Sequence, residues 1–206
     1  MQTAPHANPR RCLLRAAAVF LLGLVEGRLW TTSFGATTIL DPAQVARQFI
    51  QRSWQKKDGL PDNTVQALLQ TRDGYLWIGT SRGLVRFDGL KFAVFDHVNS
   101  PEMVNDNCRS LAEDLAGNLW IGTADGLLRL RDGKFKRFTR KDGLAYSRAE
   151  TRDRVGPIHA DRRGNVWVTT VRLNLLRGDS IRSYGIPQGL MAEAVFTIHE
   201  DAAGML

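Results

Sequence analysis

Two histidines recur at the same place in successive stretches of the sequence, and they are the first residues whose spacing could support chemistry. His159 and His199 each stand two residues before an aspartate. Two imidazoles with neighbouring carboxylates could bind a metal ion or act as a general base. Leu69 and Ala112 occupy the equivalent place in two earlier stretches, which favours a tolerated packing position over a site.

No other pattern in the sequence predicts a catalytic or metal site. The chain has two cysteines, Cys12 and Cys108, and four histidines, without the spacing of a zinc site. It has neither a GxGxxG nor a P-loop motif. We therefore expect no catalytic residues, no metal, no cofactor and no enzymatic turnover.

A repeat of forty-odd residues organises most of the chain. Trp77, Trp120 and Trp167 stand 43 and 47 residues apart, each three residues after a glycine, and a fourth copy starts at Ala203. Apolar, strand-like runs precede and follow each tryptophan segment, including one at 195–201. Asp-Gly and Gly-Asn pairs between the runs suit tight hairpin turns. Each unit therefore predicts four short strands.

Such units must stack, because a single four-stranded sheet cannot bury both of its faces. A period in the forties with four strands per unit is typical of β-propeller blades. We predict an all-β fold with about three and a half four-stranded antiparallel blades, an incomplete propeller. The repeats occupy 54–206, with blades at about 55–97, 98–140 and 145–185 and a partial blade at 186–206. The tryptophans are expected to lie buried between adjacent blades.

The first 35 residues have the order of a secretory signal peptide. Arg10, Arg11 and Arg15 precede an apolar run from Ala16 to Val25, which is too short to span a bilayer. The arginine pair also resembles a twin-arginine export signal. We expect a periplasmic location, with 36–53 as a lead-in segment; a buried helix of the mature fold is the alternative.

The charge of the chain argues against nucleic-acid binding. The formal net charge is +7, and part of it belongs to the arginines of the first 35 residues. The remainder intersperses both signs without a run of Lys or Arg of the kind that binds phosphates.

Propellers usually bind small ligands at the channel mouth, which the blade-linking loops and the loops between second and third strands form. Here these are 56–64, 96–107, 140–154 and 185–194, with 80–83, 123–126 and 171–174. Arginines in them could hold carboxylates or acidic sugars through bidentate contacts, whereas the alternative for each is a solvated loop charge. The candidate ligand-binding residues are Asn63, Arg82, Asn107, Asp125, Arg152 and Arg172.

One stretch resembles a known family. The string Trp-Gln-Lys-Lys-Asp-Gly-Leu-Pro-Asp-Asn-Thr-Val at 54–65, followed by Gly-Tyr-Leu-Trp-Ile-Gly-Thr and Gly-Leu-Val-Arg-Phe, is similar to the two-component regulator propeller repeat. Asp142-Gly143-Leu144 and Gln188-Gly189-Leu190 echo its Asp-Gly-Leu element. The third unit departs from it, with Val-Arg-Leu-Asn at 171–174 in place of a glycine turn.

The resemblance implies the N-terminal part of the periplasmic sensor region of a hybrid histidine kinase or diguanylate cyclase. In that family a transmembrane helix and the output module follow the propellers, so this segment is expected to sense a ligand without catalysing a reaction. The implied partners are a small molecule such as a carbohydrate and the remaining blades or other copies of the chain. The membrane is reached only through a downstream segment. A propeller lyase-type enzyme and a stand-alone or truncated scaffold are the alternatives.

Overall fold

The computed structural model describes residues 52–145, 154–191 and 195–206, which fall within a compact unit, Gln51–Leu206. The predicted signal peptide and nearly all of the predicted lead-in lie outside the described residues. The described part contains strands and three single turns of 3-10 helix, η1 (Lys56–Asp58), η2 (Arg140–Asp142) and η3 (Ile186–Gln188). No helix in these ranges has the length and apolar character needed to cross a membrane.

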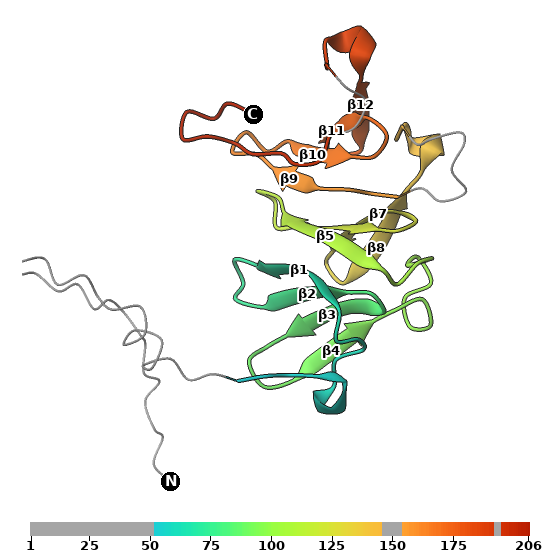
Figure 1. Ribbon diagram of the computed structural model, residues 1–206, viewed down its shortest axis with the longest axis vertical. Coiled ribbons are helices and arrows are strands. Elements are labelled where there is room, and N and C mark those ends of the chain that lie inside the picture. The colour runs from blue at the N-terminus through green and yellow to red at the C-terminus, as the bar shows by residue number, and fades with distance from the viewer. Residues whose placement is uncertain (1–51, 146–153, 192–194) are drawn as a thin grey trace, which may run out of the picture. The chain divides into compact units, whose positions relative to one another are not determined.

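Three antiparallel sheets follow one another along the chain, and each pairs four consecutive strands in order (Figure 1). Sheet 1 consists of β1 (Val65–Gln70), β2 (Leu76–Thr80), β3 (Gly83–Phe87) and β4 (Phe92–Phe95). Sheet 2 consists of β5 (Cys108–Glu113), β6 (Leu119–Thr123), β7 (Gly126–Arg131) and β8 (Lys134–Phe138). Sheet 3 consists of β9 (Ile158–Ala160), β10 (Val166–Thr169), β11 (Leu173–Arg177) and β12 (Ser180–Tyr184). The predicted all-β fold with four-stranded antiparallel blades is confirmed, whereas the exact domain limits stay a prediction.

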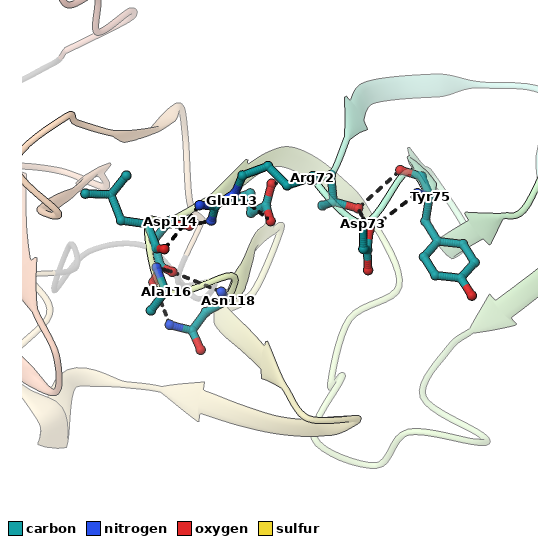
Figure 2. Close-up of polar contacts among 9 residues, drawn as sticks. Arg72, Asp73, Tyr75, Glu113, Asp114, Ala116 and Asn118 are labelled. Atoms are coloured by element: carbon teal, nitrogen blue, oxygen red, sulfur yellow. Dashed lines mark hydrogen bonds and ion pairs between the residues drawn. The ribbon is translucent and has the colours of Figure 1, made fainter. Parts of the chain in front are cut away.

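The turn before each tryptophan strand is held by one acidic side chain in sheets 2 and 3. Asp114 accepts hydrogen bonds from the backbone of Ala116 (3.0 Å) and Asn118 (2.9 Å), as Figure 2 shows, and from the Trp120 indole (2.8 Å). Asp161 is bonded in the same way to Trp167 (2.9 Å) and its own turn. This network explains the repeated spacing, since a buried indole N–H needs an acceptor.

The core lies between successive sheets. β5 packs against β1 and β2, and β9 packs against β5 and β6 (Figure 1). Trp77 is buried in the cluster shared by sheets 1 and 2, and Trp120 in the one shared by sheets 2 and 3. The prediction of buried tryptophans is correct for these two and wrong for Trp167, which is only partly buried.

A glycine in the tryptophan strand lets the next sheet approach closely. A Cβ at Gly79 would lie 2.9 Å from the Cys108 carbonyl oxygen of β5, and one at Gly122 would lie 2.8 Å from Val155 Cγ1. Sheet 3 has Thr169 at this position, and Gly156 stands beside its hydroxyl. In sheet 3 the glycine therefore makes room for a side chain of its own sheet.

An arginine joins neighbouring sheets at the end where these turns lie. The Arg72 backbone N–H donates to the Glu113 carboxylate (2.9 Å), and its guanidinium pairs with the same carboxylate (3.2 Å) and donates to the Asp114 and Leu115 carbonyls (Figure 2). The Arg162 backbone N–H likewise donates to the Glu200 carboxylate (3.2 Å), and its guanidinium donates to the Ala202 carbonyl (3.0 Å). Between sheets 2 and 3 the equivalent positions hold Leu115 and Ala160.

The strand predicted at 195–201 is wrong, because the structure assigns no strand within 195–206. In the other repeats the first strand pairs only with the tryptophan strand, and Leu206 is the position at which that strand begins. The turn itself forms, since Asp201 accepts bonds from the backbone of Ala203 (2.9 Å) and Met205 (2.8 Å).

Candidate functional site

The Asp-Gly-Leu element places the loops that link the sheets. Its residues form the turns η1, η2 and η3, and each ends at a glycine with a left-handed backbone, with φ of 109°, 99° and 98° for Gly59, Gly143 and Gly189. The leucine that follows is buried at Leu60 and Leu144. The loops that precede sheets 1 and 3 are therefore each anchored to the core by a buried leucine.

The linking loops meet the loops between second and third strands at one end of the sheets. The Ser81 N–H donates to the Thr64 carbonyl (3.2 Å), and the Ala124 N–H donates to the Asn107 carbonyl (3.0 Å). We call this end, formed by 61–64, 105–107, 154–156, 81–82, 124–125 and 170–172, the loop end. The opposite end, with the turns at 72–74, 115–117 and 162–164, is the turn end.

Three of the predicted residues occupy equivalent positions in the second loops of the sheets. The Arg82 side chain is 73% exposed and lies 3.7 Å from an Asp62 carboxylate oxygen. Asp125 lies 3.7 Å from the Arg137 guanidinium, which also donates to its carbonyl (3.2 Å). Arg172 is exposed. The two arginines thus remain accessible at the loop end, and Asp125 is engaged within its own sheet.

The other predicted residues divide into one capping residue, one inter-sheet contact and one undescribed position. Asn63 accepts a bond from the Lys56 N–H (2.8 Å) and so holds η1 in place. Asn107 accepts a bond from the Gln66 side chain of sheet 1 (2.9 Å). Arg152 lies outside the described residues. The five described residues of the predicted set therefore share one end of the fold without converging on one point.

A shallow hollow of about 370 Å³ lies on the first strands of the three sheets. It is lined by Ala67, Leu68, Arg109, Ser110, Leu111, Gly156, Pro157 and Ile158. Two larger hollows lie between sheets 1 and 2, one of about 530 Å³ beside β4 and β8 and one of about 490 Å³ toward the turn end. Of these three hollows, the 370 Å³ one includes a charged residue next to the loop end.

Sequence reasoning missed that charged residue, Arg109, and its counterpart in sheet 1, Gln66. Both stand where the register of the first strand shifts, between Val65 and Ala67 and between Cys108 and Ser110. A bulge adds one residue to a strand and re-aims its side chain. Comparing the repeats position by position would have drawn attention to the change from an amide to a guanidinium.

The two repeated histidines lie in different surroundings. His159 Nε2 lies 3.5 Å from a Glu200 carboxylate oxygen, and His199 is exposed. The described ranges contain no group of three or more His, Cys, Asp or Glu side chains that could hold a metal ion. Cys108 is fully buried, and burial, together with the Asp106 carboxylate, raises the pKa of its thiol to about 12, so it is a packing residue.

The repeated sheets define this protein as an assembly of propeller blades. The extracellular domain of a B. thetaiotaomicron protein described as the hybrid two component system BT3049 superposes with a TM-score of 0.64 at 19% identity, covering 75% of this chain and 22% of that one. The corresponding domain of BT4673 from the same organism gives 0.59 at 22% identity, covering 73% and 21%. These likenesses show the fold, and the chain spans about a fifth of the length of either domain.

The sequence of the first repeat matches a family model. Residues 59–82 match the family model described as Two component regulator propeller, so the chain carries a repeat of that family and the predicted resemblance is confirmed. A virginiamycin B lyase from Staphylococcus aureus matches with a TM-score of only 0.47 at 16% identity, over 63% of this chain and 44% of that one. No curated protein sequence matches the chain.

Proposed function

We propose that this chain is a ligand-sensing propeller segment of an exported membrane receptor whose output module is a histidine kinase or a diguanylate cyclase. The observation that carries this proposal is the family repeat at 59–82 within a fold shared with extracellular domains of two-component systems. In this proposal the segment binds a ligand and catalyses no reaction itself.

We place the ligand site at the loop end. Adjacent sheets are connected there, because the Gln66 side chain of sheet 1 donates both to Ser81 of its own sheet and to Asn107 before sheet 2 (2.9 Å each). A ligand held by loops of two sheets would therefore bias how the blades pack. The proposed contacts are Asn63, Arg82, Asn107, Asp125, Arg152 and Arg172, and the proposed ligand is a small molecule such as a carbohydrate.

A thermal-shift screen of mono- and oligosaccharides on the full chain tests this proposal. The variants Arg82→Ala and Arg172→Ala should each reduce the stabilisation by a binding sugar. Arg163→Ala, an exposed arginine at the turn end, is the matched control and should keep it. If a sugar still binds both loop-end variants but not Arg163→Ala, the site lies at the turn end and the proposed location is wrong.

The two alternative functions, a propeller lyase and a stand-alone scaffold, would each require different features of the loop end. A propeller lyase would require a cluster of catalytic acids and bases at the channel mouth, and no contact described at the loop end favours it. A stand-alone scaffold would bind no small molecule, so the same screen separates it from a sensor.

A further inference from the structure

A neutral amide contact joins sheets 1 and 2 at the loop end. The Gln66 side chain donates to Asn107 Oδ1 and to Ser81 Oγ, both at 2.9 Å. Gln66 reaches Asn107 because it is the extra residue in the bulge of β1. The three side chains need no charged partner.

The same three positions between sheets 2 and 3 hold Arg109, Arg154 and Ala124. Arg109 corresponds to Gln66, because it is the extra residue in the bulge of β5. Ala124 corresponds to Ser81, since the N–H of each donates to the carbonyl just before the first strand of its sheet.

Arg154 corresponds to Asn107 by position before the first strand. Leu111 pairs with the third residue of β6, and Ile158 pairs with the third residue of β10, so the two residues are equivalent. Four residues before them stand Asn107 in sheet 2 and Arg154 in sheet 3. Two amides and a hydroxyl at one interface are thus replaced by two guanidiniums and a methyl group at the next.

Two guanidiniums cannot satisfy each other, because each only donates hydrogen bonds. Burial and the neighbouring Arg154 guanidinium lower the pKa of Arg109, so the two charges lie close enough to repel. Within the described ranges neither arginine forms a hydrogen bond or an ion pair. Arg109 also lines the 370 Å³ hollow beside Ser110 and Gly156, which leaves room for a small group next to it.

We propose that Arg109 and Arg154 together bind an oxyanion, a carboxylate or a sulfate or phosphate ester, at the loop end between sheets 2 and 3. An oxyanion has several oxygen lone pairs, so it can accept hydrogen bonds from both guanidiniums at once, and its negative charge reduces the repulsion between them. The inference rests on the proposed function in placing the ligand at the loop end, and it specifies the ligand as acidic, such as an acidic sugar.

The first test converts the arginine pair into the amide pair that the chain already uses. The full chain is titrated with sulfate, acetate and glucuronate, with chloride holding the ionic strength constant. We expect glucuronate and sulfate to bind and to raise the melting temperature. Arg109→Gln combined with Arg154→Asn should weaken binding about a hundredfold, since each charge-assisted contact contributes about a factor of ten. Without an anion this variant should melt no lower than the unaltered chain, because the charge repulsion is gone.

The second test builds the proposed site at the neighbouring interface. Gln66→Arg with Asn107→Arg and Ser81→Ala should raise the number of bound anions from one to two. Arg163→Gln at the turn end should change neither affinity nor number. An affinity unchanged by Arg109→Gln with Arg154→Asn would overturn the inference. Binding of a neutral sugar without any binding of the acidic probes would overturn it as well, while leaving the sensing function intact.

Discussion

At the scale of single residues, the best-defined chemistry in this protein is structural. The Asp161 carboxylate accepts bonds from the Asn165 side chain (2.6 Å), the Trp167 indole (2.9 Å) and two backbone N–H groups of its turn. Burial alone would raise the pKa of Asp161, but these hydrogen bonds outweigh it and lower the pKa below the usual value. The ionised form is therefore the one that the fold stabilises.

Acidification should destabilise the fold through this residue. A carboxyl whose pKa is lowered on folding contributes stability above its unfolded pKa, about 3.9, and loses that contribution as the pH falls through the lower folded value. Melting temperatures measured from pH 7 down to pH 3 should fall toward the acid end. Asp161→Asn should lower stability at pH 7 and reduce the fall in melting temperature toward pH 3, which we call the acid limb. Asp132→Asn, at an exposed turn, should preserve that limb, and an equally steep limb in Asp161→Asn would contradict the assignment.

The candidate site was predictable from sequence only in part at this scale. Strand order places the loops at one end, so the location of Arg82 and Arg172 follows from the repeat alone. The roles of Gln66 and Arg109 do not, because they depend on a bulge, and nothing in the local residue types signals an extra residue in β1 or β5.

At the scale of the strands, the positions of glycine and threonine in the three sheets show how neighbouring segments fit together. Sheets 1 and 2 place glycine in the tryptophan strand, at Gly79 and Gly122, whereas sheet 3 has Thr169 there and Gly156 opposite it. A Cβ at Gly156 would collide with the Thr169 hydroxyl. The two positions are therefore expected to tolerate one side chain between them.

Gly156→Ala should destabilise the chain by about 1–3 kcal/mol, the usual cost of overpacking a well-packed site. Combining it with Thr169→Gly should recover much of that loss by removing the clash, although glycine in a strand carries its own entropic cost. Urea unfolding of the two single variants and the double variant measures the coupling. Strictly additive effects would show that the two residues do not compete for the same space.

The arginine contact that joins neighbouring sheets at the turn end varies in a correlated way along the chain. Arg72 contacts Glu113 and Arg162 contacts Glu200, whereas the equivalent positions between sheets 2 and 3 hold Leu115 and Ala160. Where the first position holds an arginine, the second holds a glutamate, and where the first holds an apolar residue, the second does too. This correlation indicates that each pair acts as a unit.

A double-mutant cycle on the first pair tests this reading. Arg72→Leu and Glu113→Ala should each cost about 1 kcal/mol or less, since Arg72 is 56% exposed and solvent screens the pair. The combined variant copies the Leu115–Ala160 pair and should cost less than the sum of the single changes. Thermal or urea unfolding gives the coupling energy, and a value of zero would mean that the pair contributes only through backbone contacts.

The third repeat shows how single residues set the limits of an element. The first strand of the third repeat is short and begins only at Ile158, because Pro157 has no N–H to donate. The irregular turn at 171–174 is held by Asn174, a fully buried side chain whose amide donates to the Val168 and Arg172 carbonyls (3.1 Å each). Such buried polar anchoring cannot be read from residue type alone.

At the scale of the whole molecule, export is the first property to test. An alkaline phosphatase fused after Leu206 should be active when residues 1–35 are present, because the enzyme needs the oxidising periplasm to form its disulfides. Deleting 10–25 should abolish the activity without reducing expression. An active fusion after that deletion, or a full-length cytoplasmic product, would show that this segment is no export signal.

The last prediction concerns how many blades a stable fold requires. Each blade buries its faces on two neighbours, and closed propellers generally contain four to eight blades. The first two tryptophans are 5% and 2% exposed, beneath a following sheet, whereas Trp167 is only partly buried and Phe196 and Met191 are largely exposed. Apolar surface of this kind drives association. A polypeptide of residues 36–206 should therefore associate or aggregate. Further blades, or several copies arranged around one axis, should cover the exposed apolar surface. Light scattering coupled to size exclusion, with a thermal melt, measures it, and a soluble monomer with a cooperative transition would show that three sheets and a partial repeat suffice.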